Sequence, residues 1–198
     1  MGKQHHNRNL GLSARSRHEI DQHEQSFLAA LAREESFFRQ RSQHYPKATI
    51  DIAVATSTDG RSAYGAVIHT AQGSYELSLL TDTTPQRTTL MAAEASLASL
   101  LTPHSITLAS TSGYLVESMA EGHVRKWSRN GWQTTTGAPV KSRDLWLSIL
   151  RLGERHAVKF QFKVSAAMER AKALAAKALP KAAAASHPDR KTKGASAM

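Results

Sequence analysis

The chain contains no cysteine, which excludes disulfide bonds and thiolate metal ligands and is typical of proteins from a reducing compartment. Long hydrophobic runs are also lacking, because no apolar stretch approaches the roughly 18 residues that a membrane-spanning helix needs. Residues 1–13 have no apolar core of the kind that a secretory signal carries. From these absences we expect a cytoplasmic protein with no membrane partner.

Positive charge, in contrast, is abundant. Lys and Arg number 26 against 16 Asp and Glu, which gives a net charge of +10 over 198 residues. Residues 163–198 alone carry eight cations and two anions. Excess positive charge favours a polyanionic partner, because binding releases the counterions condensed on that partner. Charge alone leaves simple solubility as an equal alternative.

Between residues 46 and 180 the hydrophobic pattern predicts an α/β domain. Alternating, β-branched stretches indicate three successive strands, and Thr84 is predicted to cap a helix that starts at Pro85. A strand, a short helix, a longer helix, a fifth strand and an alanine-rich helix follow. The predicted strands are residues 48–56, 64–70, 74–80, 106–110 and 158–164. The predicted helices are residues 85–101, 112–120, 143–156 and 166–185, the last of them broken at Pro180.

The two ends of the chain are predicted to lie outside this domain. Residues 1–45 combine a polar start with an amphipathic helix over residues 17–43, and residues 181–198 form a basic, disordered tail. The amphipathic helix could dock on the domain, pair with a second copy or bind a protein partner. We therefore divide the chain into segments 1–45, 46–180 and 181–198.

Residues 125–150 combine aromatic rings with positive charge. All three tryptophans of the chain lie here, at positions 127, 132 and 146. Four cations lie close to the first two tryptophans in the sequence, namely Arg125, Lys126, Arg129 and Lys141. An aromatic ring can stack on a base, and a neighbouring cation can pair with a phosphate. We call residues 125–141 the handle and predict that it binds nucleic acid, whereas Trp146, at helical spacing from Ile149 and Leu150, is predicted to lie in the core.

The string from Trp127 to Trp146 closely resembles the basic protrusion of bacterial type 1 ribonuclease H, whose pattern is roughly W-K-x-x-G-W-x-x-x-x-x-x-P-V-K-N-x-D-L-W. Residues 83–97, 108–119 and 168–175 echo other segments of that family, so the resemblance covers about residues 49–179. It implies the α/β ribonuclease H-like fold, with a five-stranded mixed sheet flanked by helices. It also implies binding of RNA–DNA hybrids, whose RNA strand the family cuts with Mg²⁺.

The catalytic half of the resemblance is missing. Four family carboxylates hold the magnesium ions, and their positions fall here on Ala55, Thr89, Thr111 and Lys172. Hard divalent cations need anionic oxygen ligands, so we expect no metal and no cofactor. Asp51, Asp59 and Glu94 are poorly placed to substitute. We expect Lys172 to lie near a phosphate instead.

More of the binding half is retained. The resemblance assigns phosphate or groove contacts to several positions, and together with neighbouring cations they give the predicted nucleic-acid site: Thr84, Gln86, Arg125, Lys126, Trp127, Arg129, Trp132, Lys141 and Lys172. Family asparagines that read ribose hydroxyls are replaced here by Pro85 and Gln86. The glutamine before the tyrosine and the asparagine after Lys141 are replaced by Gly113 and Ser142. Discrimination of RNA from DNA depends on that hydroxyl, so no hybrid preference is predicted.

Three functions are compatible with these residues. The first is a nucleic-acid-binding protein on a ribonuclease H-like scaffold, without hydrolytic activity, that binds a hybrid, RNA or DNA. The second is an active ribonuclease H with a displaced metal site. The third is a structural or assembly component of a ribonucleoprotein, in which the two ends of the chain contact RNA.

Overall fold

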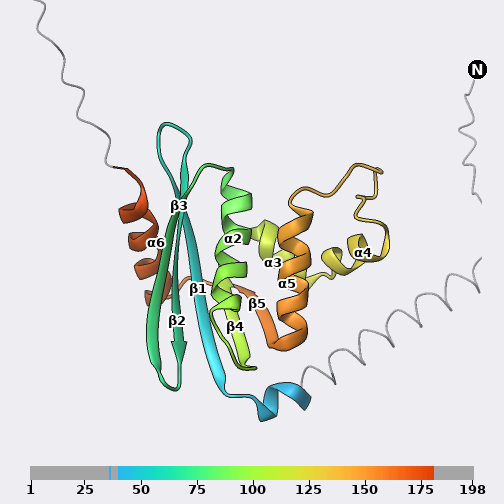
Figure 1. The fold of residues 1–198 in the computed structure, drawn as a ribbon, viewed down its shortest axis with the longest axis horizontal. Coiled ribbons are helices and arrows are strands. Elements are labelled where there is room, and N and C mark those ends of the chain that lie inside the picture. Colours follow the sequence, from blue (N-terminus) through green and yellow to red (C-terminus); the bar gives the residue numbers. More distant parts are fainter. Residues whose placement is uncertain (1–35, 37–39, 181–198) are drawn as a thin grey trace, which may run out of the picture.

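The structure, a computed structural model, describes Ser36 and residues 40–180, and its centre is one mixed sheet of five strands in the order β3-β2-β1-β4-β5 (Figure 1). The first three strands form an antiparallel meander, and β4 and β5 continue the sheet parallel to β1. The strands are β1 (Lys47–Thr56), β2 (Ser62–Thr70), β3 (Gly73–Thr81), β4 (Ser105–Ser110) and β5 (Ala157–Phe162).

Helices cover both faces of the sheet. One helix, α6, lies against β1 and β2 on one face, and α2, α3 and α5 lie on the other (Figure 1). The short helix α4 stands apart from the sheet, beyond α5. The helices are α2 (Pro85–Ala98), α3 (Gly113–Ala120), α4 (His123–Arg129), α5 (Arg143–Arg155) and α6 (Ala166–Ala178).

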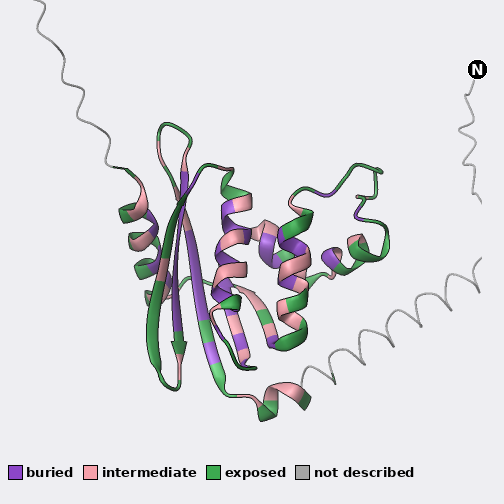
Figure 2. Cartoon of the chain, viewed as in Figure 1, coloured by how far each residue is buried: buried purple, intermediate pink, exposed green. Residues whose placement is uncertain are grey.

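The side chains of each strand point alternately to the two faces of the sheet, and this alternation determines which residues form the core. Ile50 and Ile52 of β1 are fully buried against α2 and α5, together with Trp146. Ala53, one residue later, points to the other face and packs against α6 in a smaller cluster. Figure 2 shows the middle of β1 buried between the helices of the two faces. The approach of α6 depends on Gly65, because a Cβ there would fall on the Ala171 carbonyl oxygen and within 2.7 Å of Leu174 Cβ. The sheet is therefore sandwiched between a large and a small apolar layer.

The sequence predictions of five strands and of the helices that flank them are confirmed, with bounds that shift by a few residues. One detail differs. The helix α4 was not predicted, since it is seven residues long and follows Gly122, which has a left-handed conformation and provides no side-chain cap. The predicted break of the last helix at Pro180 is confirmed, because α6 ends at Ala178 and Leu179, before the proline, is extended. Residues 181–185 lie outside the described residues.

Most of the predicted helix over residues 17–43 lies outside the described residues. Ser36 and residues 40–44, which are described, are helical. The tail 181–198 lies wholly outside the described residues. Across the described part of the chain, no helix combines the length and the apolar character needed to cross a bilayer.

Candidate nucleic-acid interface

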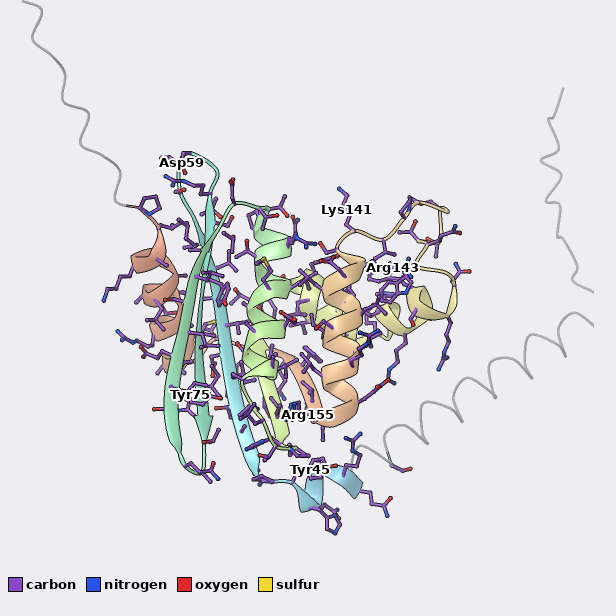
Figure 3. All side chains as sticks on the ribbon, viewed as in Figure 1. Tyr45, Asp59, Tyr75, Lys141, Arg143 and Arg155 are labelled. Atoms are coloured by element: carbon purple, nitrogen blue, oxygen red, sulfur yellow. The ribbon has the colours of Figure 1, made fainter. Side chains whose placement is uncertain are left out.

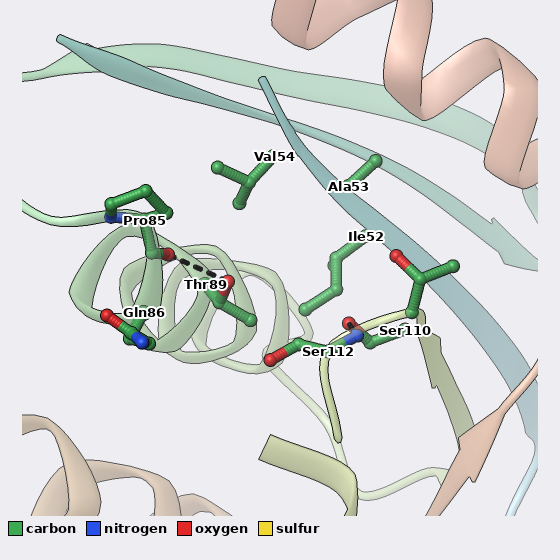
Figure 4. Close-up of a pocket in the computed structure, with 9 residues that line it drawn as sticks. Ile52, Ala53, Val54, Pro85, Gln86, Thr89, Ser110 and Ser112 are labelled. Atoms are coloured by element: carbon green, nitrogen blue, oxygen red, sulfur yellow. Dashed lines mark hydrogen bonds between the residues drawn. The ribbon is translucent and has the colours of Figure 1, made fainter. Parts of the chain in front are cut away.

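A pocket opens where β1 and β4 end, beside the starts of α2 and α3 (Figure 4). The parallel register pairs Ile52 with Ser110, so Ala53 and Thr111 are next to each other one step further along. The first turn of α2 forms the opposite wall. The lining residues are Ile52, Ala53, Val54, Pro85, Gln86, Thr89, Ser110, Thr111 and Ser112.

Two helix starts face this pocket. Thr84 caps α2 by accepting a hydrogen bond from the Arg87 N–H at 3.4 Å, as the sequence predicted, and Pro85 occupies the first turn. Ser112 caps α3 in the same way, and its own N–H donates to Ser110 Oγ at 3.1 Å. The amide groups at a helix start carry partial positive charge, so this end of the sheet is favourable for an anion.

The residues of the pocket do not fit a pair of magnesium ions. All nine lining side chains are uncharged, and they offer only hydroxyl and amide oxygens. Thr89 Oγ1 is already used, because it donates to the Pro85 carbonyl at 2.9 Å. Within residues 40–180 and Ser36, no three His, Asp or Glu side chains gather to hold a metal ion. Two divalent ions need several carboxylates to offset their charge, and this pocket supplies none.

The three carboxylates that might have substituted are engaged elsewhere. The Asp51 side chain is buried and accepts a hydrogen bond from Ser165 Oγ at 2.5 Å, on the α6 face of the sheet. Asp59 pairs with Arg61 in the β1–β2 turn, which holds the pKa of this carboxyl far below its usual range. Glu94 accepts from Ser148 Oγ at 2.9 Å, between α2 and α5. They do not form a displaced cluster.

Only two of the four positions that match the family's carboxylates line the pocket. Thr89 and Thr111 line the pocket, as expected of residues from α2 and the end of β4. Ala55 does not line it, and the register instead places Ala53 beside Thr111. Residues 55 and 56 pair with β2 and extend past the part of β1 that pairs with β4. The assignment of Ala55 to the family's first-strand position stays a prediction, and Ala53 is the β1 residue that the register brings beside Thr111.

Lys172 does not line the pocket. It is exposed on α6, and its Nζ donates to Glu169 Oε1 at 2.8 Å, one turn earlier on the helix. The adjacent carboxylate offsets the charge of Lys172. The expectation that Lys172 lies near a phosphate stays a prediction, and the partial positive charge beside the pocket is that of the helix starts.

The handle consists of α4 and the loop that follows it. Trp132 has a left-handed backbone with φ 63°, and its N–H donates to the Trp127 carbonyl at 2.7 Å. Its side chain is 6% exposed and belongs to the main core, with the Arg143 guanidinium 5.9 Å from the ring centroid. A ring so buried cannot stack on a base. The burial of Trp132 gives it a structural role in the shape of the handle, and its contact with nucleic acid stays a prediction.

The other two tryptophans differ from each other. Trp146 is fully buried and donates from Nε1 to Tyr114 Oη at 3.3 Å, as the sequence predicted for a core residue. Trp127 is half-buried, edge-on to Trp146 and stacked against the His123 ring at 6.1 Å. Only Trp127 keeps part of its ring at the surface of the handle.

The predicted cations of the handle are on its surface. Arg125, Lys126, Arg129 and Lys141 are all exposed. Partial desolvation, and then the neighbouring Arg129, lower the pKa of Arg125, although a guanidinium stays charged at neutral pH. Like charges are held close together here, which favours a polyanion.

A contact that the sequence analysis missed connects the handle to the pocket. Arg87, in the first turn of α2, donates from Nη1 to Asp144 Oδ1 at 2.9 Å and from Nη2 to Asp144 Oδ2 at 2.5 Å. Asp144 is in the first turn of α5, three residues after Lys141. The starts of α2 and α5 are therefore tied side by side. The two residues are 57 positions apart, so this contact could not be predicted from a single sequence without an alignment of relatives.

Comparisons with known proteins agree with this geometry. The family model that matches the chain is that of RNase H, over residues 51–168. A ribonuclease HI from Synechocystis sp. is 40% identical over 105 residues, which cover 52% of this chain and 66% of that protein. A ribonuclease H from Prosthecochloris aestuarii is 38% identical over 102 residues, which cover 51% and 70%. The matches thus span about two thirds of each relative.

Solved structures show the same fold. The crystal structure of LC9-RNase H1, a type 1 RNase H with the type 2 active-site motif, superposes with a TM-score of 0.58 at 19% identity, covering 68% of this chain and 72% of that one. The foamy viral protease-reverse transcriptase in complex with RNA/DNA hybrid superposes with a TM-score of 0.56 at 17% identity, covering 70% of this chain and 20% of that one.

Proposed function

Because the chain belongs to the ribonuclease H family, we propose that it binds nucleic acid on the face formed by the pocket and the handle, and that it does so without a metal ion and without hydrolysis. The observation that carries this proposal is the chemistry of the pocket. Its walls are those of a ribonuclease H fold, yet none of its nine lining residues is a carboxylate.

The loss of carboxylates changes what the pocket attracts. A cluster of carboxylates repels a phosphate unless metal ions are bound between them. Here that repulsion is absent, and the starts of α2 and α3 supply partial positive charge beside the hydroxyls of Ser112 and Thr111. A backbone phosphate can therefore approach without a divalent ion.

The handle provides the second contact region. Its exposed cations bind phosphates, and the Arg87–Asp144 ion pair ties the start of α5, just after Lys141, to the start of α2, where Thr84 and Gln86 lie. Contacts at the pocket and at the handle together position one nucleic-acid strand across the binding face. Since Pro85 and Gln86 replace the family's ribose readers, the partner is defined by its phosphates, and an RNA–DNA hybrid, RNA or DNA qualifies.

An active ribonuclease H is the competing function, favoured by the names of the relatives. It requires a metal site assembled from carboxylates that now lie apart, on β1, the β1–β2 turn and α2. A hybrid with a labelled RNA strand, incubated with Mg²⁺ and with Mn²⁺, tests this directly. We expect an intact strand, and metal-dependent cleavage by the purified chain would reject the proposal.

Restoring the carboxylates tests the pocket itself. We expect the variant Ala53→Asp, Thr89→Glu, Thr111→Asp to bind hybrid more weakly in a chelator, because three negative charges repel the phosphate, and to recover binding with Mn²⁺. The matched variant Ala55→Asp, Thr89→Glu, Thr111→Asp should recover less, because residue 55 lies outside the pocket. Equal behaviour of both variants and the unmodified chain would show that the pocket is not part of the binding face.

A further inference from the structure

The charges of the domain are divided between two halves of the chain. Residues 46–124 carry three cations and seven anions, whereas residues 125–159 carry eight cations and two anions. The handle accounts for four of those eight cations, Arg125, Lys126, Arg129 and Lys141. The other four lie beyond the handle, on α5 and β5, and the proposed function gives them no role.

Three of these remaining cations follow one side of α5. Arg143, Arg151 and Arg155 fall in an i, i+4 series with the half-buried Leu147 between the first two. Positions four apart lie on neighbouring turns of the same helix face. All three arginines are exposed, and Figure 3 shows Lys141 and Arg143 at one end of α5 and Arg155 at the other. We call Arg143, Arg151 and Arg155 the arginine stripe.

The stripe differs from three arginines elsewhere in the domain. Arg61, Arg87 and Arg170 each form an ion pair, with Asp59, Asp144 and Glu76. Among the residues that the structure describes, no carboxylate lies within ion-pair distance of Arg143, Arg151 or Arg155. Instead, Arg143 lies over the Trp132 ring.

Acidic neighbours do not neutralise the stripe. Asp144, beside Arg143, is bound by Arg87. Glu154 is exposed near Arg155, so one carboxylate accompanies three guanidinium groups. The field of Arg155 is felt at the buried His156, where it contributes, after burial itself, to a lowered pKa. The net charge along this side of α5 is therefore positive.

Helix stabilisation explains only one end of the stripe. A cation in the last turn interacts favourably with the helix dipole, which accounts for Arg155. The same dipole disfavours a cation in the first turn, where Arg143 lies, and it has little effect at Arg151 in the middle. A ligand with negative charges along its length accounts for all three.

We infer that the arginine stripe extends the nucleic-acid interface from the handle along α5, and that it binds the phosphate backbone of a duplex held at the handle. Twelve residues of helix rise about 18 Å from Arg143 to Arg155, and a duplex strand carries a phosphate about every 3.4 Å along its axis. The stripe is thus long enough for about five phosphates. Arg143, next to the Trp132 ring, joins it to the handle without a gap.

This inference rests on the proposed function, and the experiment separates the two. The probe is a labelled RNA–DNA hybrid of about 20 base pairs, titrated by fluorescence anisotropy over a range of salt concentrations. The test variant is Arg151→Gln, Arg155→Gln. The matched control, Arg61→Gln, Arg170→Gln, removes the same charge from arginines on the other half of the domain, and Arg151→Lys, Arg155→Lys retains the charge of the stripe.

We expect the test variant to bind about tenfold more weakly near 0.1 M salt, with a salt slope smaller by about two, because each lost phosphate contact removes about one unit. The control should change affinity by less than about twofold, and the lysine variant should keep most of the slope. Urea midpoints of all variants identify any loss of folding.

Three results would overturn the inference. If the test variant and the control bind alike while Lys141→Ala weakens binding, the stripe is not a contact and the proposed function stands. If the unmodified chain binds no hybrid, duplex RNA or duplex DNA, the proposed function fails and the stripe fails with it. If the test variant keeps its nucleic-acid affinity but releases a copurifying protein, the stripe serves a protein partner.

Discussion

Arg87 of α2 and Asp144 of α5 form a two-pronged ion pair that joins the pocket to the handle, with Nη1 to Oδ1 at 2.9 Å and Nη2 to Oδ2 at 2.5 Å. The Arg87 guanidinium holds the pKa of the Asp144 carboxyl below its usual range. Such fork-to-fork geometry fixes orientation as well as distance. The pair therefore ties the start of α5 to the start of α2.

A double-mutant cycle with Arg87→Gln and Asp144→Asn tests this pair. We expect a coupling free energy of about 0.5–1 kcal/mol in urea unfolding at neutral pH, because both side chains are partly exposed. The folded pKa of Asp144 is lowered, so the coupling should be present above the unfolded pKa of about 4 and vanish as the pH falls through the folded value. Additive effects of the two changes at neutral pH would show that the pair contributes no stability.

Gly65 is predicted to be intolerant of any side chain. Gly65→Ala places a Cβ on the Ala171 carbonyl oxygen and within 2.7 Å of Leu174 Cβ, so α6 must move away from β2. We expect a loss of about 1–3 kcal/mol in the free energy of unfolding. Gly153→Ala is the matched control, because that site in α5 has open space, and alanine there should add up to about 1 kcal/mol. Similar urea midpoints for the two variants would contradict the close packing of α6.

Trp132 and Lys141 are predicted to affect different properties. Trp132→Ala empties a buried site and should lower the free energy of unfolding by about 3–5 kcal/mol. Lys141 is exposed, so Lys141→Ala should leave stability nearly unchanged and reduce the salt slope of nucleic-acid binding by about one. Unfolding and binding titrations on both variants check this. A stable Trp132→Ala variant that binds weakly would restore a direct contact for that ring.

His156 is expected to make stability depend on pH. Its ring is buried, its Nδ1 accepts from the His104 N–H at 3.2 Å, and its Nε2 has no hydrogen-bond partner among the described atoms. Burial first, then the charges of Arg155 and His104, lower the pKa of His156 below 6.5. The unfolded chain then binds the proton more readily, so stability is full above about pH 6.5 and falls as the pH decreases towards the folded pKa.

Urea unfolding between about pH 7.5 and pH 5 measures this dependence. His156→Asn keeps an acceptor for the His104 N–H and should flatten the profile. His69→Asn, at an exposed site, should leave the profile unchanged. If His156→Asn retains the full loss of stability in acid, the buried histidine is not its cause.

Local chemistry made most of the fold predictable. Alternation located all five strands, and Thr84 followed by Pro85 marked the start of α2 to the residue. The helix α4 was missed because a seven-residue helix after Gly122 has too few turns to show a period. Short-range patterns therefore predicted the elements but not the smallest of them.

The site was less predictable, because it depends on contacts between distant segments. The alignment of β1 with β4 decides whether residue 53 or residue 55 faces the pocket, and the sequence alone does not give that register. The burial of Trp132 depends on its left-handed backbone, which a tryptophan rarely adopts. The neutralisation of Lys172 by Glu169, at i, i+3 spacing, was visible in the sequence and was overlooked.

The proposed function requires that this ribonuclease H fold bind a nucleic-acid backbone without a metal ion. Anisotropy titration of a labelled RNA–DNA hybrid in excess EDTA, at the ionic strength of a parallel titration with Mn²⁺, measures it most directly. We predict that the hybrid binds in EDTA with a Kd within about threefold of the Mn²⁺ value, since the pocket offers no carboxylate for the ion to offset. Loss of binding in EDTA, with recovery on adding Mn²⁺, would contradict the account.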